Sequence, residues 1–107
     1  MPRTHQETDA RSLAMHRLVA EKIRRDPALL EIAKAKLIRS RRATPNDYYF
    51  DEWARLLDAG LDAALAVATE DSEKATALRQ SSPFAGVLTP EERRSFLDEW
   101  ARTHRDR

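Results

Sequence analysis

The segment ALRQSSPFAGVLTPEERR, residues 77–94, decides how the chain folds. It joins two helical patterns through a short apolar loop, PFAGVL, and then restarts a helix at Thr89-Pro90-Glu91-Glu92. Threonine three residues before glutamate is the pattern of a capping box, and proline suits the first helical position. Because the chain is otherwise polar, this apolar loop must be covered either by the protein's own core or by a partner.

The rest of the chain also predicts helices. It has two glycines and five prolines, and no segment alternates with period two, so strands are not expected. The first three predicted helices span residues 9–25, residues 26–42 and residues 44–59. The second starts at Asp26-Pro27, and the third starts at Thr44-Pro45 and stops at Gly60. Further helices are predicted at residues 61–68, from a cap at Asp71 or Ser72 to residue 80, and from residue 89 onward. We therefore predict an all-α fold, a compact bundle of five to six short helices, with residues 1–8 flexible and residues 9–107 forming a single helical domain.

Two helices carry most of the aromatic residues. Tyr49, Phe50, Trp53, Leu56 and Leu57 form the richest apolar stripe, which predicts the centre of the core. In the last helix the candidates for burial are Phe96, Leu97 and Trp100. The pentapeptide DEWAR occurs in both helices, at residues 51–55 and 98–102. Since the two copies lie at different distances from their Thr-Pro starts, we interpret them as shared helix-forming sequence rather than a duplication. The sequence does not decide whether Trp100 belongs to the core or to an interface with a partner.

Composition limits the classes of function. Hydrophobic residues make up 41% and charged residues 35% of 107 residues, and the core is expected to be thin. The chain has no cysteine, no apolar run long enough for a bilayer and no apolar signal segment, which predicts a cytoplasmic protein that does not enter membranes. With scattered histidines and no glycine-rich loop, no metal site and no cofactor are expected. A serine nucleophile at Ser81-Ser82 would lack an obvious base.

Charge is divided between the two halves of the chain. Residues 1–43 contain 11 Lys and Arg against 5 Asp and Glu, a balance of +6, and residues 44–107 contain 8 against 13, a balance of −5. One interpretation is a nucleic-acid-binding surface in the first half, because clustered cations neutralise phosphates. The alternative is that the two halves attract each other within one fold. The candidate nucleic-acid-binding residues are Arg24, Arg25, Lys34, Lys36, Arg39, Arg41 and Arg42.

One enzymatic pattern has to be weighed. Arg11 and His16 match the Arg-x4-His spacing of helical HEPN-type ribonucleases, in which the arginine and histidine act on the scissile phosphate. A match at such spacing is expected by chance in a chain with this many arginines, and the motif usually lies late in that fold. We favour the interpretation that His16 packs near Met15 and Val19 or faces solvent, with a small ribonuclease as an alternative.

The blocks RSLAMHRLVAEKIRRDPALL, residues 11–30, and ALRQSSPFAGVLTPEER, residues 77–93, resemble small helical bacterial proteins of toxin–antitoxin modules. The resemblance implies a non-catalytic protein-binding module that neutralises a partner protein, with a further role in binding its own promoter DNA. It brings no catalytic residues. On this hypothesis Phe84, Val87, Leu88 and Trp100 contact a toxin or a second copy of the chain. The acidic second half would suit a basic partner.

Overall fold

The computed structural model describes residues 5–104, and the all-α prediction is confirmed. Within this range the chain forms six α-helices, two short 3-10 helices and no strand. The elements are α1 (His5–Arg25), η1 (Pro27–Leu29), α2 (Leu30–Ala43), α3 (Tyr48–Ala59), α4 (Leu61–Ala68), α5 (Glu73–Arg79), η2 (Ala85–Val87) and α6 (Pro90–Thr103).

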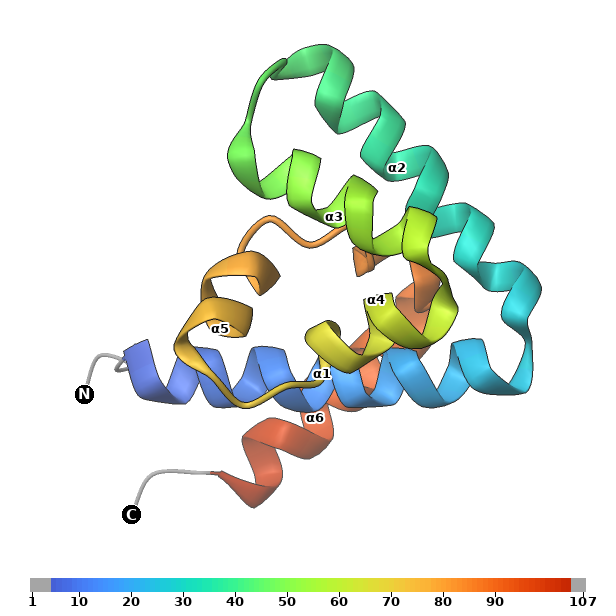
Figure 1. The fold of residues 1–107 in the computed structure, drawn as a ribbon. Coiled ribbons are helices and arrows are strands. Elements are labelled where there is room, and N and C mark those ends of the chain that lie inside the picture. The colour runs from blue at the N-terminus through green and yellow to red at the C-terminus, as the bar shows by residue number, and fades with distance from the viewer. Residues whose placement is uncertain (1–4, 105–107) are drawn as a thin grey trace.

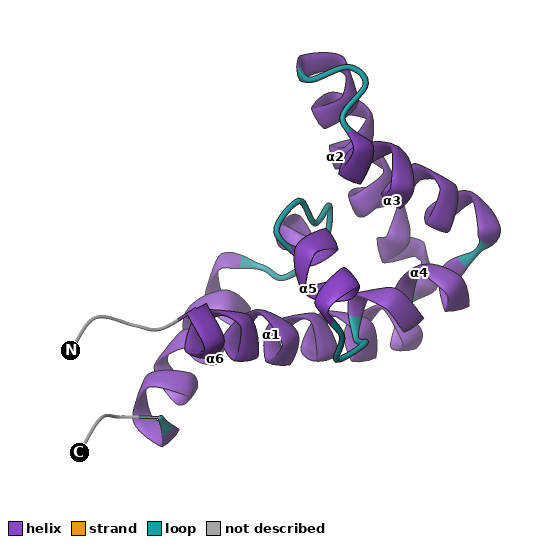
Figure 2. Ribbon diagram, turned by 60° about the vertical axis from the view of Figure 1, so that its left-hand side comes forward, coloured by secondary structure: helices purple, strands orange, loops and turns teal. Residues whose placement is uncertain are grey.

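The longest helix, α1, forms one side of the molecule. In Figure 1, α4 and α5 lie above α1, the α2–α3 pair lies beyond them, and α6 crosses α1 and extends away from the other helices. Figure 2 shows the same arrangement from another side, with the far end of α6 beyond the body of the fold. The segment between α5 and α6 therefore passes through the middle of the molecule.

Helix starts follow capping chemistry, and three of them differ from the prediction. The Ser72 cap of α5 and the Thr89–Glu92 capping box of α6 are confirmed. In contrast, α1 starts at His5 rather than residue 9, so residues 5–8 of the segment predicted to be flexible are helical; residues 1–4 of that segment lie outside the described residues. The proline at position 27 starts only a 3-10 turn before α2, which shifts that helix start.

The start of α3 also differs from the prediction of Thr44-Pro45. Thr44 is the C-cap of α2, and α3 begins three residues after Pro45, at Tyr48. The Asp47 carboxylate accepts hydrogen bonds from the backbone N–H groups of Tyr49 and Phe50, at 2.9 and 3.1 Å. A carboxylate that accepts two of the free N–H groups at a helix start is a stronger cap than threonine here, because it also carries the charge that suits this helix end.

The core is built around Trp53, as predicted. Its side chain is fully buried, its Nε1 donates a hydrogen bond to the Leu78 carbonyl at 2.8 Å, and its ring meets Phe84 edge to face at 5.5 Å. Phe84, Val87 and Leu88 are 1%, 2% and 6% exposed. In this structure these three side chains are therefore covered by the chain's own core and are not available to contact a partner. Burying the apolar loop there removes its apolar area from water.

In α6 the difference from the prediction is the reverse, because residues expected to be buried are not. None of its residues is buried, and Phe96, Leu97 and Trp100 are all only half-buried. The predicted burial of Phe96 and Leu97 is therefore wrong, and Trp100, which the sequence left open between core and interface, is partly exposed. Figure 2 shows that α6 extends away from the other helices, which leaves fewer elements to cover it.

Ion pairs join the basic and acidic halves of the chain. Lys22 pairs with Glu92 at 2.5 Å, Arg24 with Asp62 at 3.1 Å and Arg41 with Asp51 at 3.2 Å. Lys22 Nζ also donates to the Val87 carbonyl at 2.8 Å, which holds the apolar loop against α1. These contacts support the interpretation that part of the charge asymmetry is used inside the fold.

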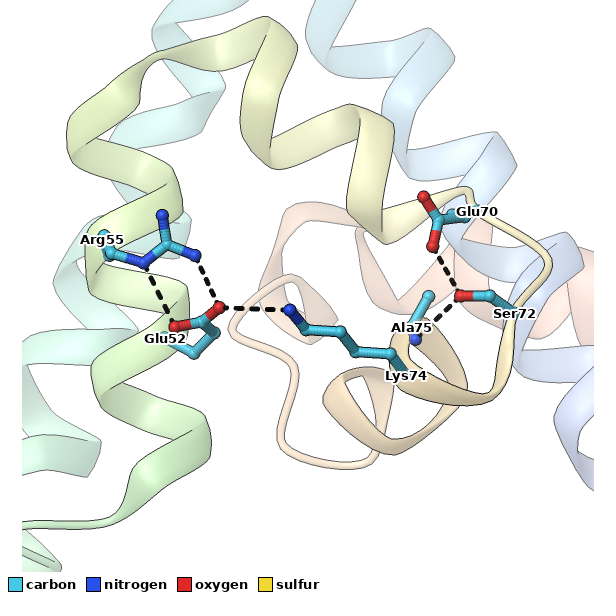
Figure 3. A network of polar contacts seen from close by, with 6 residues as sticks. All are labelled: Glu52, Arg55, Glu70, Ser72, Lys74 and Ala75. Atoms are coloured by element: carbon cyan, nitrogen blue, oxygen red, sulfur yellow. Dashed lines mark hydrogen bonds and ion pairs between the residues drawn. The ribbon is translucent and has the colours of Figure 1, made fainter.

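A second polar network connects α3 to α5 (Figure 3). Glu52 accepts hydrogen bonds from Arg55 on its own helix and lies 3.7 Å from the ammonium group of Lys74 on α5. At the start of α5 the Ser72 hydroxyl donates to the Glu70 carboxylate and accepts from the Ala75 backbone N–H. The network fixes α5 beside α3, and so fixes the segment that follows α5.

Candidate functional site

A pocket of about 410 Å³ lies where α1, α2, the segment after α5 and α6 meet. We call it the α1–α6 pocket. Its apolar wall includes Met15, Phe84 and Leu97, and its polar groups include the Ser82 hydroxyl and the His16 ring. Its volume is in the range of small-molecule sites, roughly 300–1,000 Å³. The pocket joins parts of the chain that are up to 89 positions apart, from Thr8 to Leu97, so no local pattern could predict it.

His16 and Ser82 form a hydrogen-bonded pair in this pocket. His16 Nδ1 lies 2.7 Å from the Ser12 carbonyl, which can only accept, so Nδ1 carries the proton and Nε2 is an acceptor. The Ser82 hydroxyl lies 2.7 Å from Nε2 and donates to it. The Phe84 backbone N–H donates to the same hydroxyl oxygen at 3.1 Å. The pair thus connects α1 to the apolar loop.

The surroundings of His16 favour the neutral imidazole. Its side chain is buried, and burial is the main cause that lowers the pKa of His16 below its ordinary value of 6.5. The hydrogen bond to the Ser12 carbonyl raises the pKa, and the nearby Arg79 cation lowers it. A neutral imidazole accepting from a serine hydroxyl is the arrangement of a nucleophile with its base. The prediction that a serine in the Ser81-Ser82 segment lacks a base is therefore wrong.

Besides Arg79, three cations line the α1–α6 pocket. Arg11 comes from α1, Lys36 from α2 and Arg93 from α6. Among residues 6–104 none of the three forms an ion pair, and no described residue lining the pocket is Asp or Glu. Arg93 Nη1 lies 3.6 Å from the sulfur of Met15, which sets α6 against α1. The pocket is thus positively charged.

Arg79 borders the same pocket, but its guanidinium group is used elsewhere. Its Nη1 donates to the carbonyls of Ala68 and Glu70, at 3.3 and 2.7 Å, and its Nη2 donates to the Thr76 hydroxyl at 3.1 Å. The residue is 5% exposed, and its Nε has no hydrogen-bond partner among the residues that the structure describes. Burial lowers the pKa of Arg79 below its ordinary value, while Asp71 and Asp9 oppose this effect. Through these hydrogen bonds Arg79 links α5 to the C-terminal end of α4.

The structure brings the two residues of the Arg-x4-His pattern to one pocket. Arg11 and His16 line the same pocket, although both ring nitrogens of His16 are already hydrogen bonded. His16 packs edge to face against Phe84, with ring centroids 6.1 Å apart. The prediction that His16 packs inside the fold agrees with its burial, and its neighbour across the chain, Phe84, is one that the sequence could not indicate.

The predicted basic residues do not form one surface. Arg24, Lys34 and Arg41 each form an ion pair, and Lys36 faces the α1–α6 pocket. Lys34 and Arg41 border a different, smaller depression between α2 and α3. Arg25, Arg39 and Arg42 are exposed and form no ion pair within the part of the chain that the structure describes. Helical geometry explains the division, because positions two apart on a helix point in nearly opposite directions.

A separate aromatic surface is found on α6. The rings of Phe96 and Trp100 stack with centroids 6.1 Å apart, and Trp100 also stacks on His104 at 3.5 Å. Phe96 and Trp100 are partly exposed, as is Leu97 beside them, and we call these three residues the α6 aromatic face. Of the four residues predicted to contact a partner, only Trp100 is available to do so.

Comparison with protein-family models, with curated proteins and with solved structures finds no match for this chain. No helix in the described range is long and apolar enough to cross a bilayer. Among the residues that the structure describes, no three His, Asp or Glu side chains are grouped so that they could hold a metal ion. Arguments about function therefore depend on the geometry of this molecule alone.

Proposed function

We propose that this chain is a non-catalytic helical binding module of the antitoxin type, which binds and neutralises a partner protein through the α6 aromatic face. The observation that carries the proposal is that α6 is a well-capped helix with three large apolar side chains and no buried residue. Exposed aromatic groups on one helix supply the anchors that dominate protein interfaces, and a helix presented this way suits a groove on a partner.

Charge supports a basic partner. Residues 44–107, which include α6, carry a balance of −5, whereas α6 itself is nearly balanced, with Glu91, Glu92, Asp98 and Glu99 against Arg93, Arg94 and Arg102. Part of this charge is paired within the chain: Glu92 with Lys22 and Glu99 with Arg102. The acidic balance of this half of the chain as a whole would steer a basic protein toward it and lower the affinity for acidic ones. An RNA-cleaving toxin, which must itself bind phosphates, has this kind of surface.

The test combines binding with folding. The tagged chain is purified together with the protein encoded by the neighbouring gene, at low and at high salt. We expect Trp100→Ala to weaken the complex by about tenfold or more, as for a central interface aromatic, without changing the circular dichroism spectrum. Tyr48→Ala, an aromatic side chain that is 61% exposed on α3, is the matched control and should bind as the natural chain does.

Two results would contradict the proposal. The first is a Trp100→Ala chain that still retains the partner and still relieves its growth inhibition. The second is a homodimer in sedimentation equilibrium that Trp100→Ala dissociates, because the α6 aromatic face would then be occupied by a second copy of the chain.

A second candidate function, binding of single-stranded nucleic acid, is favoured by the corner between α2 and α3. Arg39 and Arg42 near the end of α2 are exposed, and Tyr48 and Tyr49 at the start of α3 are 61% and 39% exposed. The two tyrosine rings meet edge to face at 5.2 Å. Cations beside exposed aromatic rings bind phosphates and stack on bases.

Fluorescence anisotropy of a labelled single-stranded oligonucleotide tests this candidate across a salt series. We expect Arg42→Gln to make the salt dependence shallower and Tyr48→Ala to weaken binding at every salt concentration, since only the first removes a phosphate contact. Arg24→Gln removes a cation that is paired with Asp62, and it serves as the control. Equal losses for all three variants would contradict a specific corner site.

A further inference from the structure

Within the described residues, Arg11, Lys36 and Arg93 of the α1–α6 pocket lack the ion pairs that several cations of α1 and α2 form. Lys22, Arg24 and Arg41 each have a carboxylate within 3.2 Å. Arg11, Lys36 and Arg93 have none among residues 6–104, although they come from three different helices and border one cavity. Like charges brought together in this way repel each other, and an anion placed between them removes that repulsion.

The other groups of the pocket restrict the kind of anion. Thr8, Ser12 and Gln80 add polar atoms to the lining, whereas Met15, Val19, Phe84 and Leu97 add an apolar wall. A bare ion would leave that wall in contact with water. A ligand with an anionic group at one end and a ring at the other would use both parts, and the volume of about 410 Å³ accommodates a molecule of that size.

The pair of His16 and Ser82 fixes the shape of the pocket without competing for the anion. The Ser82 hydroxyl donates its proton to His16 Nε2, and the His16 proton on Nδ1 is donated to the Ser12 carbonyl. Neither hydrogen is free for a ligand. The charge for binding must therefore come from the guanidinium and ammonium groups, which form strong hydrogen bonds with phosphate oxygens.

We propose that the α1–α6 pocket binds a phosphate monoester of nucleotide size, with the phosphate held by Arg11, Lys36 and Arg93. The organic part of the ligand lies against Met15, Phe84 and Leu97. The pocket shares Leu97 with the α6 aromatic face, but the cations that hold the phosphate are not part of that face, so the proposal does not depend on the function proposed above. A phosphate monoester occurs both in a free nucleotide and at the 5′ end of a nucleic acid, and the two sources share the chemistry that the pocket recognises.

Isothermal titration calorimetry of the full chain with AMP, at low ionic strength, tests the proposal. We expect Arg93→Gln to weaken AMP binding by about tenfold or more, because it removes a charge-assisted hydrogen bond to phosphate. Arg94→Gln is the matched control, since it removes the same charge from the next position of α6 and Arg94 does not line the pocket. The double variant Arg11→Gln and Arg93→Gln should show no measurable binding.

Further titrations separate the sources of the ligand. Adenosine, which lacks the phosphate, should bind far more weakly than AMP. Stronger binding of AMP than of a 5′-phosphorylated oligonucleotide would assign the pocket to free nucleotides, and the reverse would assign it to nucleic-acid ends.

Three outcomes would overturn the proposal: no binding of either phosphate ester at millimolar concentration, equal losses for Arg93→Gln and Arg94→Gln, or adenosine binding as tightly as AMP. Arg93 is exposed, so its variant is expected to fold, and circular dichroism at the titration temperature verifies this.

Discussion

The two copies of DEWAR, residues 51–55 and 98–102, form the same local structure, but their tryptophans differ in burial. In α3 and in α6 the glutamate pairs with the arginine three positions later, Glu52 with Arg55 and Glu99 with Arg102. In both copies the arginine lowers the pKa of the glutamate below its ordinary range. Yet Trp53 is fully buried, and Trp100 is partly exposed.

The difference lies in what packs against each helix. Trp53 is enclosed by Phe84 of the apolar loop, and Leu78 of α5 supplies an acceptor for its indole N–H. The ring contacts of Trp100 are with Phe96 and His104, which belong to its own helix or directly follow it. The comparison teaches that a pentapeptide fixes a helical turn and its ion pair, whereas burial depends on residues that are distant in the sequence.

The largest effect is expected from Trp53→Ala. Removing a fully buried indole leaves a cavity and an unpaired Leu78 carbonyl, so we expect a loss of about 3–5 kcal/mol in the free energy of unfolding. Urea unfolding followed by circular dichroism measures it, with Trp53→Phe as the more conservative variant. A loss similar to that of Trp100→Ala would break the contrast between the two copies.

A smaller effect is expected from pH, through the group that packs on Phe84. The pKa of His16 is below 6.5 in the folded chain, so the unfolded chain binds a proton there first as the pH falls. The contribution of His16 to stability is therefore complete above pH 6.5 and is lost as the pH falls toward the lower pKa of the folded state.

Urea unfolding at about pH 7.5 and about pH 6 measures this effect, in a range where most carboxylates stay ionised. His16→Gln should reduce the pH dependence, while His104→Gln, which changes an exposed residue at the end of α6, should leave it unchanged. An unaltered pH dependence in His16→Gln would assign the effect to another group.

Trp100→Ala should affect stability little, by less than about 1 kcal/mol, because the indole is partly exposed and its ring contacts lie within its own helical segment. The same urea titration measures it. A loss of several kcal/mol would show that α6 belongs to the core and would remove the main support for the proposed interface.

The smallest difference is expected between Glu52→Gln and Glu99→Gln. The Glu52 side chain is 14% exposed and also meets Lys74, whereas Glu99 is 59% exposed and pairs only with Arg102. Solvent weakens the more exposed pair, so Glu52→Gln should lower the melting temperature more. Differential scanning calorimetry in low and in 1 M salt compares them, since salt should reduce the difference.

Local signals predicted much of the helical part of the fold. The capping box at Thr89 and the serine cap at Ser72 depend on residues three apart, and a single sequence contains all of that information. The start of α3 was missed because Thr44-Pro45 and Asp47 offer competing starts, and Asp47 supplies two hydrogen bonds.

The candidate sites depended on contacts across the chain. Sequence alone left Phe84 open between core and partner, and it gave no sign that His16 and Ser82, 66 positions apart, would form a hydrogen bond. It also grouped seven basic residues that the fold separates, with Lys36 turned to the α1–α6 pocket and Arg41 paired with Asp51.

The sequence by itself determined the all-α class, the caps at Ser72 and Thr89, the ion pairs within helices and the central place of Trp53, because these follow from side-chain periodicity and from contacts three or four residues apart. Only the tertiary structure decided that the loop at Phe84 lies inside, that Trp100 lies outside, and that Arg11, Lys36 and Arg93 meet at one cavity. Each of these outcomes depends on which distant helix covers a given face, and the free energy of burial assigns the limited core to the arrangement that removes the most apolar area from water.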